Sequence, residues 1–181
     1  CTFPAEERFM NLQQIAESYG FPYEEHEVHT SDGYILTLMR ISHGRENADI
    51  PNRPPIFLVH SFLDSAVFWA FRGPELSPVF YLADSGYDVW LYNARGTSRS
   101  LEHETLNWQI NNEYWDISWL DQSYDFDACI EDILAITGYE NLAVAVANLY
   151  NSQFFTGMAS RPEFYRDRLS VVLSFQPIFE F

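Results

Sequence analysis

The sequence has 181 residues, of which 47% are hydrophobic and 17% are aromatic, so it can bury the core of one globular domain. Its 10 Lys and Arg against 26 Asp and Glu give a formal net charge of −16, which argues against nucleic acid as a partner. No apolar run approaches the roughly 18 to 20 residues of a membrane span, so none is expected.

The first part of the chain predicts a helix and a hairpin. Apolar residues at helical spacing indicate a helix over residues 6–19 that ends at Gly20. Two strand-like segments, 24–29 and 34–41, flank the turn residues 31–33. Because the connection is so short, these strands must pair antiparallel.

The rest of the chain alternates strand-like and helix-like segments, which is typical of a mostly parallel sheet with right-handed crossovers. The segment 55–59 is a continuous apolar run, as in a strand buried on both faces. The elements expected here are, in order, a polar loop over 43–54, a strand over 55–59, a helix over 77–85, a strand over 87–92, a helix over 119–136, a strand over 142–147, a helical stretch and a strand over 169–175.

The two cysteines form neither a disulfide framework nor a metal-binding pair. Cys129 shares a helical stripe with Phe126 and Ile130, which predicts a buried, inert thiol. Cys1 is a candidate for a bridge to another chain. Since the sequence begins at Cys1 without Met, we expect an end made by processing and a secreted protein. We expect no cofactor and no metal.

Several short motifs follow one another in a fixed order. They are EEHEVHTSDGYIL at 24–36, FLVHSFLDS at 57–65, LADSGYDVWL at 82–91, NARG at 93–96 and YWDISW at 114–119. In this order they resemble the acid lipases, the family of lysosomal and gastric lipases and their insect relatives, and the resemblance extends over nearly the whole chain. The NARG form is most similar to the insect branch.

The resemblance implies an α/β-hydrolase fold, a mostly parallel sheet with an antiparallel N-terminal hairpin. Residues 1–181 would then be the N-terminal part of a single lipase-like domain, without its last strands. The apolar strand expected over 169–175 would have an unpaired edge, which is an aggregation hazard. We therefore expect a companion C-terminal chain, cut from the same precursor, to complete the sheet.

In that family the catalytic serine lies on a sharp strand-to-helix turn, Gly-His-Ser-Gln-Gly, whose small residues let the backbone bend. Counted without gaps from the flanking motifs, the turn corresponds to residues 146–150, Val-Ala-Asn-Leu-Tyr. The nucleophile position is then Asn148. An amide nitrogen is not a nucleophile at neutral pH, because its lone pair is delocalised into the carbonyl. The resemblance therefore implies a lipase without activity, and Val146 and Tyr150 are expected to crowd the turn.

Ser152 is the alternative nucleophile, because Asn151-Ser152-Gln153 imitates His-Ser-Gln. Placing Ser152 at the turn requires an insertion of about four residues before it and an equal deletion after it, with Tyr150 and Phe154 where glycines belong. The rival hypothesis is thus an active two-chain lipase in which a companion chain supplies the catalytic acid and base.

By position, the remnant oxyanion hole consists of the backbone N–H groups of Phe62 and Leu149. Ser61 replaces a glycine of the motif, so the loop either merely connects strand and helix or retains a site for an anion. We expect an apolar cleft lined by Phe62, Leu63, Leu149 and Tyr150.

The resemblance places the acid and histidine of the triad beyond Phe181, and two further residues are expected to have structural roles. His60 matches a packing and hydrogen-bonding histidine. Arg95 follows a strand, and we favour a buried charge partner over a substrate clamp.

The predicted function is a non-catalytic lipase-like protein that serves as a nutrient store or as a carrier of a lipid or other apolar ligand. Lipase-like proteins without activity serve as egg yolk proteins in insects, so the resemblance favours storage, in the extracellular space or in vesicular granules. A charge of −16 suits a protein kept at high concentration.

Overall fold

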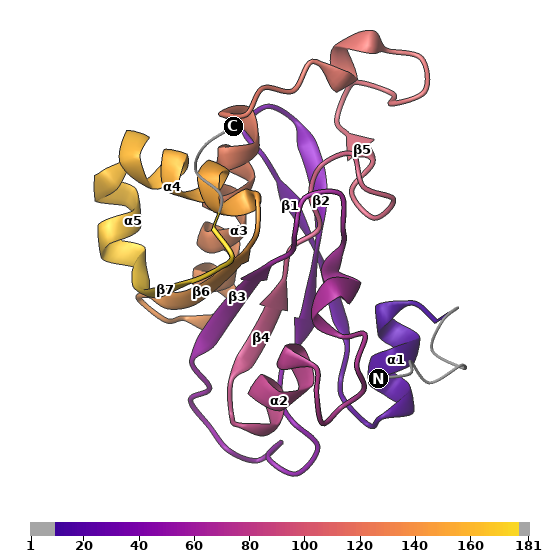
Figure 1. Cartoon of the computed structure of the whole chain (residues 1–181), viewed down its shortest axis with the longest axis vertical. Coiled ribbons are helices and arrows are strands. Elements are labelled where there is room, and N and C mark those ends of the chain that lie inside the picture. The colour runs from indigo at the N-terminus through magenta and orange to yellow at the C-terminus, as the bar shows by residue number, and fades with distance from the viewer. Residues whose placement is uncertain (1–9, 178–181) are drawn as a thin grey trace.

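The computed structural model describes residues 10–177, which build one seven-stranded mixed sheet flanked by helices (Figure 1). The strand order is β1-β2-β4-β3-β6-β7, and β5 pairs with β2. The elements are α1 Leu12–Ser18, β1 Glu24–His29, β2 Tyr34–Ile41, β3 Pro55–Val59, the 3₁₀ turn η2 Ala66–Trp69, α2 Pro78–Asp84, β4 Asp88–Leu91, β5 Glu102–His103, the 3₁₀ turn η3 Asn112–Trp115, α3 Asp121–Thr137, β6 Leu142–Ala147, α4 Tyr150–Ser160, α5 Pro162–Arg168 and β7 Leu169–Phe175.

The N-terminal elements follow the predicted pattern. Helix α1 begins at Asn11, whose side chain accepts a hydrogen bond from the Gln14 N–H while the Gln14 side chain caps Asn11 in return. Residues 6–9 of the predicted helix lie outside the described residues. Strands β1 and β2 pair antiparallel as predicted. Their turn needs Gly33, because φ is 92° and a Cβ there would lie 2.8 Å from the His103 ring.

The strands β4, β3, β6 and β7 pair parallel, which confirms the predicted crossover pattern. Every residue of β3 is buried, as its continuous apolar sequence predicts. The pattern gave no element between residues 96 and 119, where the structure has the short β5 and η3. The carboxyl ends of β3 and β6 lie side by side, so the loops that follow these two strands are neighbours.

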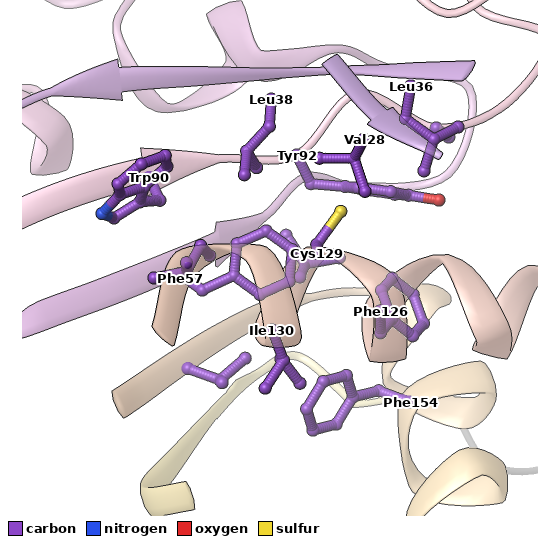
Figure 2. Packing of buried hydrophobic residues seen from close by; sticks show 14 of the residues in the cluster. Val28, Leu36, Leu38, Phe57, Trp90, Tyr92, Phe126, Cys129, Ile130 and Phe154 are labelled. Carbon is purple, nitrogen blue, oxygen red and sulfur yellow. The ribbon is translucent and has the colours of Figure 1, made fainter. Parts of the chain in front are cut away.

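The sheet separates two apolar cores, with α3, α4 and α5 on one face and α1, α2 and η2 on the other (Figure 1). In the first core, Phe126, Cys129 and Ile130 of α3 pack against Phe57 and Tyr92 of the sheet (Figure 2). The Cys129 thiol is buried as predicted, and burial raises its pKa well above the usual value.

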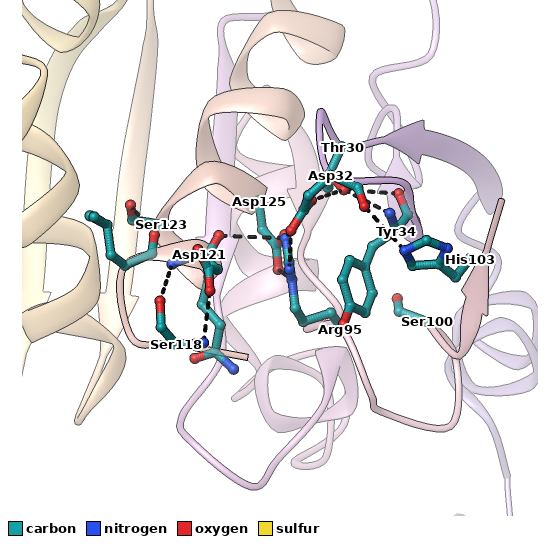
Figure 3. A network of polar contacts seen from close by, with 12 residues as sticks. Thr30, Asp32, Tyr34, Arg95, Ser100, His103, Ser118, Asp121, Ser123 and Asp125 are labelled. Carbon is teal, nitrogen blue, oxygen red and sulfur yellow. Dashed lines mark hydrogen bonds and ion pairs between the residues drawn. The ribbon is translucent and has the colours of Figure 1, made fainter. Parts of the chain in front are cut away.

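A buried charge network joins the hairpin, the segment after β4 and α3 (Figure 3). The Arg95 guanidinium lies 2.5 Å from Asp125 and 2.6 Å from Asp32, and 3.9 Å from the centroid of the Tyr34 ring. Burial alone would lower the pKa of Arg95, but the two carboxylates raise it. Tyr92 donates a hydrogen bond of 2.8 Å to Asp125. Arg95 is thus a buried charge partner, as expected.

Replacing Asp125 by Ala should destabilise the fold by about 3 kcal/mol, because it leaves the Arg95 charge buried with Asp32 alone. Urea unfolding followed by circular dichroism measures the change. Asp167→Ala is the control, since its ion pair with Arg166 is exposed and should leave the midpoint unchanged. Equal midpoints for the two variants would contradict the importance of the network.

Candidate functional site

The turn between β6 and α4 places Asn148 where a strand reverses sharply into a helix. Its φ is 50°, in the left-handed region, which Asn tolerates better than most residues. Val146 is still part of β6, and Tyr150 begins α4. The sharp turn forms although no glycine stands at either position.

Two hydrogen-bonding groups fasten this turn to β7. The Asn148 N–H donates to the Phe175 carbonyl at 2.8 Å. The buried Asn151 amide donates to the carbonyls of Asn148 at 2.7 Å and Phe175 at 3.2 Å, and its oxygen accepts from the Ser174 hydroxyl. The role of Asn151 does not follow from local sequence, because its partner Ser174 lies 23 positions later. A signal is its place in a predicted helix, since Asn is a poor helix former.

The loop after β3 lies next to this turn. The Asn148 Nδ2 donates a hydrogen bond of 2.9 Å to the Ser61 hydroxyl, across 87 positions of sequence. Residues 61–64 form a tight turn, in which the Asp64 N–H donates to the Ser61 carbonyl at 3.1 Å. Within it, Phe62 is 38% and Leu63 89% exposed. The structure thus brings together the loops that carry Phe62 and Leu149.

His60 lies buried beneath this loop and does not face solvent. Its Nδ1 donates to the Ser61 carbonyl at 2.7 Å, and its Nε2 accepts from the Ala94 N–H at 3.2 Å. Both partners fix one neutral tautomer, and burial lowers the pKa of the ring. The ring stacks on Tyr92 at 5.4 Å between centroids, which agrees with a packing and hydrogen-bonding role.

The four residues expected to line an apolar cleft differ in their exposure. Tyr150 packs inside the sheet–helix core, with ring centroids 5.4 Å from His60, 5.9 Å from Tyr92 and 6.0 Å from Phe62. Leu149 is half-buried and Leu63 extends into solvent. The rings of Phe62 and Tyr150 are therefore in contact, whereas Leu63 faces solvent.

Two hollows in the described part of the chain lie away from this turn. One of about 430 Å³ lies between the hairpin and α3, where His29, Tyr124 and Glu131 are among its lining residues. Another of about 520 Å³ is lined by Arg99, His103 and Trp108, among others. Within residues 10–177 no group of three His, Cys, Asp or Glu side chains is placed to hold a metal ion, and no helix combines the length and apolarity needed to cross a bilayer.

Ser152, the alternative nucleophile, lies in the first turn of α4. Its N–H donates to the Leu149 carbonyl at 3.1 Å, and its carbonyl accepts from the Thr156 hydroxyl at 2.7 Å. Ser152 is therefore part of a helix, whereas Asn148 occupies the turn that follows β6. Cys1 lies outside the described residues.

The sequence of the chain is similar to lipases over most of its length. A family model described as a partial α/β-hydrolase lipase region matches residues 12–73. Lipase member K of Homo sapiens is 38% identical over 175 residues, 93% of this chain and 42% of that protein. Lipase 1 of Drosophila melanogaster is 36% identical over 169 residues, 93% of this chain and 36% of that protein. A lysosomal acid lipase/cholesteryl ester hydrolase of Macaca fascicularis is 36% identical over 171 residues, or 42% of its length.

The fold is similar to solved α/β-hydrolases. An esterase from Pyrococcus furiosus has a TM-score of 0.62 at 16% identity, with 89% of this chain and 51% of that one covered. An epoxide hydrolase from Vigna radiata has a TM-score of 0.55 at 14% identity, with 84% and 38% covered. These confirm the predicted fold as a partial α/β-hydrolase. The chain spans 33% to 42% of the length of the curated relatives it matches.

The buried, neutral His60 should make the fold less stable as pH falls below about 6.5, the value of a free histidine. In this pH range His60 binds a proton in the unfolded chain but not in the folded protein. The folding free energy that depends on neutral His60 is therefore lost as pH falls toward the lowered pKa of the folded state. His60→Gln should show a smaller loss than the parent protein between about pH 7.5 and about pH 5 in chemical unfolding. Parallel curves for the two proteins would show that His60 does not cause the pH dependence.

Proposed function

Because the chain belongs to the acid lipase family of α/β-hydrolases, we propose that it forms part of a non-catalytic, lipase-like protein. The observation that carries this proposal is Asn148 at the turn between β6 and α4, with φ of 50°. This is the place where the fold displays its nucleophile. An Asn amide cannot attack an ester, and no neighbouring base can activate it as a base activates a hydroxyl.

Within the non-catalytic class we propose a nutrient store of the yolk type, secreted or kept in vesicular granules. Two features favour storage over a carrier of an apolar ligand. A carrier would need Tyr150 and Leu63 on the walls of one cleft, whereas Tyr150 packs in the core and Leu63 is 89% exposed. The net charge of −16 keeps copies apart by repulsion at high concentration.

The alternative function is an active two-chain lipase with Ser152 as nucleophile. It would require Ser152 to reach an acyl group from within the first turn of α4, where its backbone is helical. A nucleophile activated by histidine must also lie within about 3 Å of it. In the described chain His60 is buried and both of its ring nitrogens are engaged, so the companion chain would have to supply this histidine.

A fluorophosphonate probe should leave the full-length protein unlabelled, because the probe reacts only with an activated serine. Mass spectrometry of the treated protein measures the adduct. An active relative such as a gastric lipase, treated in parallel, is the positive control. An adduct on a peptide that contains Ser152, absent from the Ser152→Ala variant, would overturn the proposal in favour of the two-chain enzyme.

We also propose that a companion C-terminal chain of the same precursor completes the sheet. Strand β7 pairs with β6 on one side only among the described strands. Its residues Val171, Leu173 and Phe175 are 47%, 44% and 49% exposed. An apolar edge strand of this kind is an aggregation hazard unless further polypeptide covers it. Nearby, Met158, Tyr165 and Val172 are among the residues that line a hollow of about 330 Å³, which a covering segment could fill.

Native mass spectrometry should then find a complex heavier than the 21.1 kDa of this chain. Denaturation should split it into this chain and a lighter or heavier companion, because an obligate interface of roughly 2,000 Å² or more survives dilution but not unfolding. A soluble, folded monomer of 21.1 kDa would exclude the companion. One continuous, longer polypeptide after denaturation would assign the covering strands to the same chain instead.

A further inference from the structure

The turn over residues 61–64 is strained. Leu63 has φ of 62°, a backbone conformation in which the Cβ of an L-residue meets the following carbonyl. Turns of this kind usually place glycine or asparagine at such a position. Burial does not compensate the strain, since Leu63 is 89% exposed. Something in the surrounding structure must therefore hold the turn in this form.

Ser61 is the residue through which the turn is held. Its carbonyl accepts two hydrogen bonds, from the His60 ring at 2.7 Å and from the Asp64 N–H at 3.1 Å. Both of these partners lie in the same loop. Its hydroxyl, in contrast, accepts from the Asn148 amide at 2.9 Å, and Asn148 directly follows the neighbouring strand β6. This last bond joins the turn to the loop after β6, where the Phe62 ring also contacts Tyr150.

We propose that the hydrogen bond between Asn148 and Ser61, called the latch below, holds the strained turn in place. It also links the loop after β3 to the loop after β6. The backbone N–H groups of Phe62 and Leu149, which in a hydrolase of this fold would bind an oxyanion, directly follow the two ends of the latch in sequence. Under this proposal, a ligand carbonyl oxygen bound by both N–H groups would compete with the hydrogen bond between Asn148 and Ser61. This inference goes beyond the proposed function and does not depend on it.

Both side chains are needed for the latch. Asn148 combines a donor of sufficient length with tolerance of φ of 50°. Glycine at position 61 would supply no hydroxyl, so the Asn148 amide would lose its partner. The two residues therefore act as a coupled pair, and a change of one should alter the effect of changing the other.

A double-mutant cycle in the full-length protein tests the coupling, with Ser61→Ala, Asn148→Gly and the double variant compared by urea unfolding. Glycine at position 148 relieves the positive φ, so Asn52→Gly is the matched control: Asn52 has φ of 59° and is exposed. We expect a coupling of roughly fivefold in the unfolding equilibrium constant, or about 1 kcal/mol, for the pair of positions 61 and 148. The pair of positions 61 and 52 should show none.

Amide hydrogen exchange of residues 62–65 provides a second readout in variants that fold. The latch predicts faster exchange in Asn148→Gly and in Ser61→Ala, with no further increase in the double variant, and unchanged exchange in Asn52→Gly. Additive unfolding effects, or exchange at the parental rate in both single variants, would overturn the latch. Neither result depends on esterase activity, so a labelled Ser152 would leave this test unaffected.

Discussion

The sharp turn at Asn148 is the constraint on which the arrangement of the sheet depends. A central parallel strand ends there, and the chain must reverse within two residues so that α4 can pack back on the sheet. The reversal requires a positive φ, which is costly for most residues. The fold holds it from two sides, through the Phe175 carbonyl of β7 and the Ser61 hydroxyl after β3. Strands β3, β6 and β7 therefore share one anchoring point.

The backbone shape of this turn does not depend on a nucleophilic side chain at position 148. Asparagine satisfies the backbone because its short polar side chain tolerates the left-handed region, yet it supplies no nucleophile. Two residues on, Tyr150 directs its ring into the core, where it meets His60, Tyr92 and Phe126. These aromatic contacts stabilise the start of α4 and with it the turn. Under the proposed function, the chain keeps the backbone frame of a hydrolase site without the nucleophile, because the fold alone does not determine the reaction.

The sequence predicts well those features that depend on local pattern. The strands Glu24–His29, Tyr34–Ile41 and Leu142–Ala147 have the predicted bounds, because apolar runs and turn residues bracket them. Strand β5 and the turn η3 were not predicted, since such short elements carry no periodicity. The positive φ of Leu63 does not follow from the local sequence, because leucine adopts this conformation only where tertiary contacts impose it. The same holds for the contact of Ser61 with Asn148, which lie 87 positions apart.

The most direct test of a non-catalytic role is the hydrolysis of a short-chain p-nitrophenyl ester by the full-length protein, from about pH 4 to about pH 8 so that an acid optimum is not missed. Removing the nucleophile of a serine hydrolase lowers the rate on the order of a million-fold. We therefore predict turnover no faster than in the presence of the heat-denatured protein. Turnover at the level of an active acid lipase, abolished by Ser152→Ala, would contradict the assignment of Asn148 to the nucleophile position.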